Sequence, residues 1–90
     1  MTRRCSSLKE NEIVVFEVKS TIIEGKDAVY DGNVIYVDNE QRIVAVCYLE
    51  GYRSMTADIP FEKMKAVYNP EGEDMWFDNI HGPSDLLIAE

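Results

Sequence analysis

The chain has 90 residues, with nine basic against seventeen acidic side chains and a formal net charge of −8. This length suits one domain with one modest hydrophobic core, and a hydrophobic content of 46% argues against wholesale disorder. The negative field repels phosphates, so the composition disfavours a nucleic-acid-binding protein.

The first eleven residues, MTRRCSSLKEN, are mostly polar, and we expect residues 1–11 to form a flexible leader. No apolar segment of signal-peptide type follows Arg3 and Arg4, and no run approaches the roughly 18 apolar residues of a membrane-spanning helix. Cys5 and Cys47 do not make a disulfide framework, which favours reduced thiols. We therefore expect a cytoplasmic protein without membrane contacts.

The next part of the chain predicts a β-hairpin. Residues 12–18, EIVVFEV, form a short run rich in β-branched residues, which favours a strand over a helix. A turn at 24–27 leads into a second strand over 28–38. Asp31 and Gly32 lie within that strand and indicate either a β-bulge or a turn; we favour the bulge, because glycine inside a strand commonly marks a local kink.

The centre of the chain predicts two further strands and one helical turn. A polar loop at 38–41 precedes RIVAVCYL, residues 42–49, the most strand-like run of the chain. A turn at 50–53 leads into a short strand over 54–60. FEKM, residues 61–64, follows a proline and predicts a single helical turn.

The last third predicts shorter elements. KAVY at 65–68 reads as a closing strand, NPEG at 69–72 as a type I turn and DMWFD at 74–78 as one more strand. HGPSDLLIAE, residues 81–90, is either a strand or an apolar segment packed on the body. Short strands at regular intervals predict that residues 12–90 form one all-β domain, a small antiparallel barrel or roll of five to six strands.

The strand at 42–49 is apolar on both of its faces, whereas a strand with one solvated face alternates with polar residues. Its second face should be covered by the C-terminal segment, by the N-terminal strand or by another copy of the chain. The last option predicts a homo-oligomer, whose interface would include Val44, Val46, Trp76, Leu86 and Leu87.

Residues 29–68 resemble the Tudor domain, a member of the SH3-like group of small barrels. The resemblance lies in Tyr30 with Gly32, VIYVD, the charged loop NEQR, IVAVCY, Gly51-Tyr52 and the helical turn with its closing strand in IPFEKMKAVY. It implies an SH3-like barrel in which aromatic rings form a cage for a methylated arginine or lysine, with Tyr30, Tyr48 and Tyr52 as the positions that match.

Two interpretations of these tyrosines stay open. A tyrosine in a small β protein commonly packs half-buried with its hydroxyl in solvent, so the three rings either fill the core or line a binding groove. If they form a groove, the nearby Glu50 favours a basic or cationic ligand.

Catalytic patterns are weak. His81, the only histidine, lies beside Ser84 and Asp85 in sequence alone, and adjacency of this kind does not make a triad. No phosphate loop occurs, and the late carboxylates lack the spacing of a calcium loop. They are Glu71, Glu73, Asp74 and Asp78. We expect no catalytic residues, no metal site and no cofactor.

The sequence thus predicts a non-enzymatic binding module that recognises a basic or cationic peptide or protein through an aromatic groove at Tyr30, Tyr48, Tyr52 and Glu50. The alternative is a small homo-oligomeric structural or regulatory accessory protein. A weaker alternative is an acidic protein that mimics nucleic acid and binds a basic partner.

Overall fold

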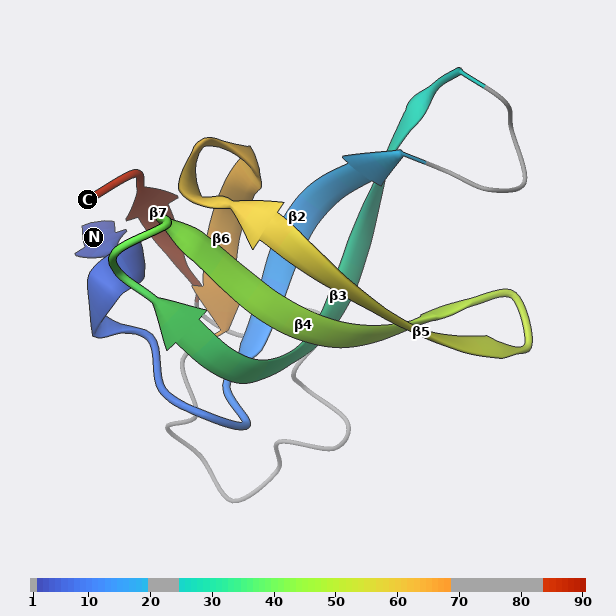
Figure 1. Ribbon diagram of the computed structural model, residues 1–90, viewed down its shortest axis with the longest axis horizontal. Helices are drawn as coiled ribbons and strands as arrows, with labels where there is room; N and C mark the ends of the chain where they lie inside the picture. The colour runs from blue at the N-terminus through green and yellow to red at the C-terminus, as the bar shows by residue number, and fades with distance from the viewer. Residues whose placement is uncertain (1, 20–24, 69–83) are drawn as a thin grey trace.

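The computed structural model describes residues 2–19, 25–68 and 84–90, which form one seven-stranded sheet (Figure 1). Its strands are β1 Thr2–Arg4, β2 Ile13–Lys19, β3 Asp27–Asp38, β4 Ile43–Glu50, β5 Arg53–Pro60, β6 Met64–Tyr68 and β7 Ser84–Ile88. The helical elements of these ranges are two single turns, η1 Cys5–Ser7 and η2 Phe61–Lys63. None of these residues belongs to a helix that could span a membrane. The predicted all-β class and the helical turn after β5 are confirmed.

Strands β2 to β5 form a meander of antiparallel neighbours, as predicted. The β3–β4 turn is held by Asp38, whose Oδ1 accepts the backbone N–H groups of Glu40 and Gln41 at 3.0 Å each. Gly51 has a φ of +63° in the β4–β5 turn, a conformation that glycine adopts without steric cost.

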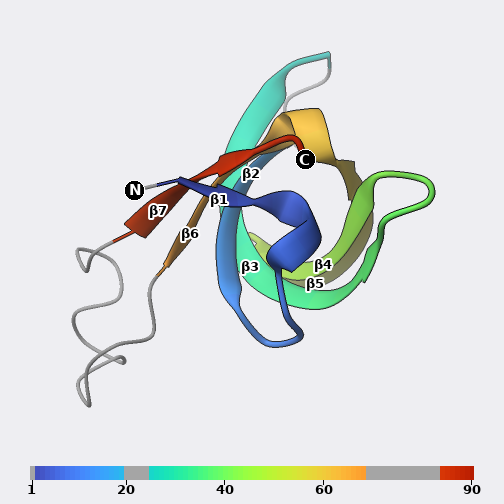
Figure 2. The same cartoon turned by 90° about the vertical axis from the view of Figure 1, so that its left-hand side faces the viewer.

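The remaining strands extend the sheet beyond β2. Strand β6 pairs antiparallel with both β2 and β7, and β1 pairs parallel with β7, giving the order β1-β7-β6-β2-β3-β4-β5. The sheet curls strongly (Figure 2), but β1 and β5 remain its two edges among the described residues. The turn predicted at 69–72 and the strand predicted at 74–78 lie outside those residues.

The bulge in β3 is displaced from its predicted place. Asp31 and Gly32 pair in regular register with β2, so the prediction at that dipeptide is wrong. The register instead shifts between Val34 and Tyr36, opposite β4. Since a bulge inserts one extra residue, the consecutive side chains of Ile35 and Tyr36 both reach the exposed outer surface.

Gly32 has a steric role. It lies opposite Tyr48, on the face of β3 that also carries the buried Val34. A Cβ atom at this position would lie 2.4 Å from the carbonyl oxygen of Cys47 and 2.9 Å from the Cβ of Tyr48. Glycine is therefore required by the close approach of β3 and β4.

The core lies inside the curl of the sheet. The ring of Phe16 meets that of Tyr48 edge to face, with centroids 5.3 Å apart. The largest fully buried side chains are Phe16, Ile59, Val14, Val34, Val44, Val46, Val67 and Cys5. Three residues predicted as interface, Val44, Val46 and Leu87, thus belong to the core instead, because alternation turns them inward.

Residues 2–11 also differ from the flexible leader predicted for them. Cys5 and Leu8 are buried in the core cluster, and the three-residue period of η1 places them on one side. Arg3 binds Glu12 with two hydrogen bonds of 2.5 and 2.8 Å, and Glu12 also accepts the backbone N–H of Lys9 at 2.7 Å. The sequence did not indicate these two core residues, because the segment around them contains few other apolar residues.

The C-terminal segment forms strand β7, one of the two forms predicted for it. The backbone N–H of Ser6 donates to the carbonyl oxygen of Glu90 at 2.8 Å, and Arg42 donates to the carbonyl oxygen of Ala89. In the strand order β7 lies between β1 and β6, and the hydrogen bond of Arg42 brings its C-terminal end near the start of β4. It does not cover the second face of β4, which was one of the roles considered for it.

Candidate binding face on strands β3 to β5

The three tyrosines of the predicted cage are not arranged as a cage. The rings of Tyr30 and Tyr48 are 5.2 Å apart between centroids, but Tyr48 is only 5% exposed and packs into the core. Tyr52 lies in the β4–β5 turn, which projects from the body (Figure 1), and its side chain is fully exposed. Tyr30 and Tyr48 therefore pack against each other, and Tyr52 lies away from both.

Glu50, the predicted acidic contact, lies inside the protein. It is 3% exposed and occupies the inward side of β4, two residues beyond Tyr48. Burial, followed by the charge of Glu50, raises the pKa of the Tyr48 hydroxyl. Glu50 makes interactions within the protein and does not stand at the surface where a ligand would reach it.

Three of the exposed large apolar residues, Ile35, Tyr36 and Leu49, lie instead on the opposite side of the same strands. We call this surface the outer face; it is formed by Ile35, Tyr36, Ile43, Ala45, Cys47 and Leu49. Leu49 is 66% exposed, Tyr36 is 53% exposed and Ile35 is 40% exposed. Large exposed side chains of this kind mark an interaction surface when they are contiguous.

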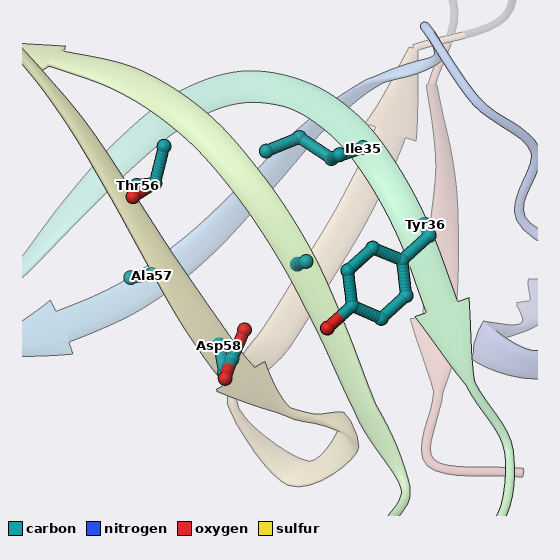
Figure 3. A pocket seen from close by; sticks show the side chains of 6 residues that line it. Ile35, Tyr36, Thr56, Ala57 and Asp58 are labelled. Atoms are coloured by element: carbon teal, nitrogen blue, oxygen red, sulfur yellow. The ribbon is translucent and has the colours of Figure 1, made fainter.

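The first hollow of the outer face has a volume of about 440 Å³. We call it the Tyr36 hollow, and Figure 3 shows the Tyr36 ring reaching over β4 towards Asp58 on β5. The register places Tyr36, Ala45 and Asp58 in one row across the three strands. Its lining is Ile35, Tyr36, Ala45, Thr56, Ala57 and Asp58.

A second hollow of about 300 Å³ lies farther along β4. We call it the Leu49 hollow, after its most exposed apolar residue. Asp31 and Leu49 lie one residue beyond the paired Gly32 and Tyr48, so they flank each other across β3 and β4. Its lining is Ile13, Asp31, Gly32, Asn33, Cys47, Tyr48 and Leu49.

Each hollow contains one aspartate, whose surroundings differ from those of Glu17 on β2. The carboxylate oxygens of Glu17 lie 3.8 Å from Nζ of Lys63 and 3.6 Å from Nζ of Lys65, so the charge of Glu17 is balanced. Within the described residues, Asp31 and Asp58 have neither an ion pair nor a hydrogen bond from a side chain. Both carboxylates are exposed and available to an external cation.

Sequence reasoning missed this site for a physical reason. The apolar second face of β4 was visible, but no pattern placed Tyr36 on the outer surface, and Asp31 was expected to lie in a bulge. The shift of the bulge towards Tyr36 is what turns the ring outward beside Asp58. The only available signal was the run Val34-Ile35-Tyr36-Val37, where alternation between apolar and polar residues breaks down.

No three His, Cys, Asp or Glu side chains in the described part of the chain are grouped as a metal site. Burial raises the pKa of the Cys5 thiol to about 11, so this thiol is protonated at neutral pH. Leu86 is exposed on β7, whereas Trp76 and His81 lie outside the described residues.

Comparison with protein-family models, curated proteins and solved structures finds no match to this chain. The resemblance to Tudor domains therefore rests on the residue pattern alone.

Proposed function

We propose that the protein is a non-enzymatic binding module that recognises a basic segment of a peptide or protein through the outer face of β3 to β5. The observation that carries the proposal is that exposed apolar side chains lie beside an aspartate in each of two hollows, and that neither aspartate forms an ion pair with another described residue. The binding surface thus differs from the tyrosine groove predicted from the sequence, while the class of ligand is retained.

The chemistry of the Tyr36 hollow suits a lysine or arginine side chain. The aliphatic stem of such a side chain covers apolar surface, here that of Ile35, while its charged end stays near solvent. A cation over the Tyr36 ring gains about 0.5–1 kcal/mol at an exposed site, and the Asp58 carboxylate adds a charge-assisted hydrogen bond. The net charge of −8 favours the approach of a basic partner.

We also propose that strands β2 to β6 form an SH3-like small barrel. The strand order β6-β2-β3-β4-β5 and the helical turn between β5 and β6 support this assignment, because the resemblance requires a closing strand after that turn. The unpaired thiols Cys5 and Cys47 support a reducing, cytoplasmic setting.

The test is a titration with peptides rich in lysine and arginine, followed by fluorescence anisotropy. We expect Tyr36→Ser to weaken binding about fivefold to tenfold, because it removes the ring face and part of the apolar lining. Tyr52→Ser is the control, since it deletes an exposed tyrosine ring that lies outside the outer face. Equal losses in both variants, or no binding by any basic peptide, would contradict the proposal.

A second candidate function is self-association through the same outer face, in a small homo-oligomeric accessory protein. The exposure of Leu49, Tyr36 and Ile35 on this face favours it. Sedimentation equilibrium separates the two functions, because a dimer formed through the outer face should dissociate in the Leu49→Lys variant. A monomer at high concentration would count against self-association.

A further inference from the structure

We infer that the ligand is an extended peptide segment carrying two cationic side chains four residues apart, one bound in each hollow. This inference rests on the proposed function and specifies the ligand of that same surface.

The spacing follows from the positions of the two hollows along β4. Ala45 lines the Tyr36 hollow and Leu49 lines the Leu49 hollow, with Cys47 between them on the same face. Neighbouring residues of a strand rise by about 3.3 Å, so Ala45 and Leu49 are separated by about 13 Å.

In an extended ligand, few spacings between two side chains match this separation. Side chains at i and i+4 of an extended chain point to the same side and are also about 13 Å apart. Residues at i and i+2 span only about 7 Å, and those at i and i+3 point to opposite sides. In a helix, residues i and i+4 rise by only about 6 Å, so a helical ligand with that spacing does not reach both hollows.

Both hollows combine an aspartate with an exposed apolar side chain, which is why two cations are required. Asp58 lies in the row of Tyr36 and Ala45, and Asp31 flanks Leu49. Each aspartate therefore has an apolar neighbour for the stem of a lysine or arginine and a carboxylate for its charged end.

The aspartates also set the path of the ligand. Asp31 is on β3 and Asp58 is on β5, the two strands that flank β4. Strands are about 4.8 Å apart, so the carboxylates are offset by roughly 10 Å across the sheet. The bound segment should therefore cross β4 obliquely, and the length of a lysine or arginine side chain covers the sideways displacement.

The experiment compares three peptides of identical composition whose two arginines are at i and i+2, i and i+3, or i and i+4 in a background of Ser and Thr. Anisotropy titrations with the full chain should show the i, i+4 peptide binding about tenfold more tightly than the others. Asp31→Asn and Asp58→Asn should each reduce that preference to about twofold or less. Glu10→Gln is the charge-matched control, because Glu10 is exposed and outside both hollows.

The outcomes separate this inference from the proposed function. If all three spacings bind equally but Tyr36→Ser still weakens them, the binding module stands and the two-site ligand is overturned. If Glu10→Gln reduces the preference as much as the aspartate variants do, binding follows net charge and the inference is also overturned. If no arginine peptide binds, both proposals fail. Circular dichroism of each variant confirms that the exposed substitution leaves the fold intact.

Discussion

Gly32→Ala is the substitution whose effect on stability follows most directly from the structure. The added Cβ would be 2.4 Å from the carbonyl oxygen of Cys47, about 1 Å closer than an ordinary contact, and 2.9 Å from the Cβ of Tyr48. Neither atom is the end of a flexible side chain, so β3 and β4 would have to separate. Overpacking a core costs about 1–3 kcal/mol, and we expect the upper end of that range, about 3 kcal/mol.

Urea denaturation measures this loss, and thermal unfolding gives a second reading. For a chain of this size, about 3 kcal/mol corresponds to a fall in Tm of roughly 12–24 °C. Gly51→Ala is the matched control: it meets no atom within 4 Å, and its φ of +63° should cost only about 1–2 kcal/mol. A Gly32→Ala variant as stable as Gly51→Ala, or more so, would refute the steric reasoning.

Three further predictions concern the core, the thiols and pH. Tyr48→Ala should lower the free energy of unfolding by about 3–5 kcal/mol because the ring is buried, whereas Tyr52→Ala should change it by less than about 0.5 kcal/mol. Urea denaturation measures both values, and a Tyr48→Ala variant as stable as Tyr52→Ala would contradict the packing of the Tyr48 ring in the core. In native protein at pH 8, the half-buried Cys47 should react readily with a chromogenic disulfide, whereas Cys5 should react only on unfolding, because burial raises its pKa to about 11. Rapid reaction of both thiols would contradict the packing of η1. The pKa of Glu12 is lowered from 4.5, mainly by its hydrogen bonds with Arg3. The contribution of Glu12 to stability is therefore present above pH 4.5 and is lost as the pH falls through the lowered pKa. Glu12→Gln should therefore be about 1–2 kcal/mol less stable than wild type at pH 7 and no less stable near pH 2, as measured by urea denaturation; a difference that persists in acid would exclude the ion pair as its cause.

The strands of the meander were predictable because their signal is local. Residues 12–18 and 42–49 carry runs of β-branched residues, and the turns between strands carry glycine or aspartate where the backbone requires them. The helical turn after Pro60 was also readable, since proline presets its own φ and favours the start of such a turn.

The errors concern features that depend on distant partners. Cys5 is buried only because β7 and η2 lie beside it, and nothing in its own neighbours indicates a core residue. The bulge near Tyr36 follows from the fit of β3 against β4, whereas Gly32 misled because glycine marks both kinks and close contacts. The binding face could not be read from single residues, because it requires the register of three strands.

The parallel pairing of β1 with β7 joins the two ends of the described chain (Figure 2). The hairpins between β2 and β5 can form one after another from near neighbours, whereas this pair requires a loop of almost the whole polypeptide to close, at a higher entropic cost. We therefore expect the terminal strands to dock last during folding and to open first by local unfolding, with amide hydrogens of β1 exchanging sooner than those of β4. Until β1 and β7 have docked, the hydrophobic interior beside η2 is open to water. The last step of folding is then also the step that closes the core.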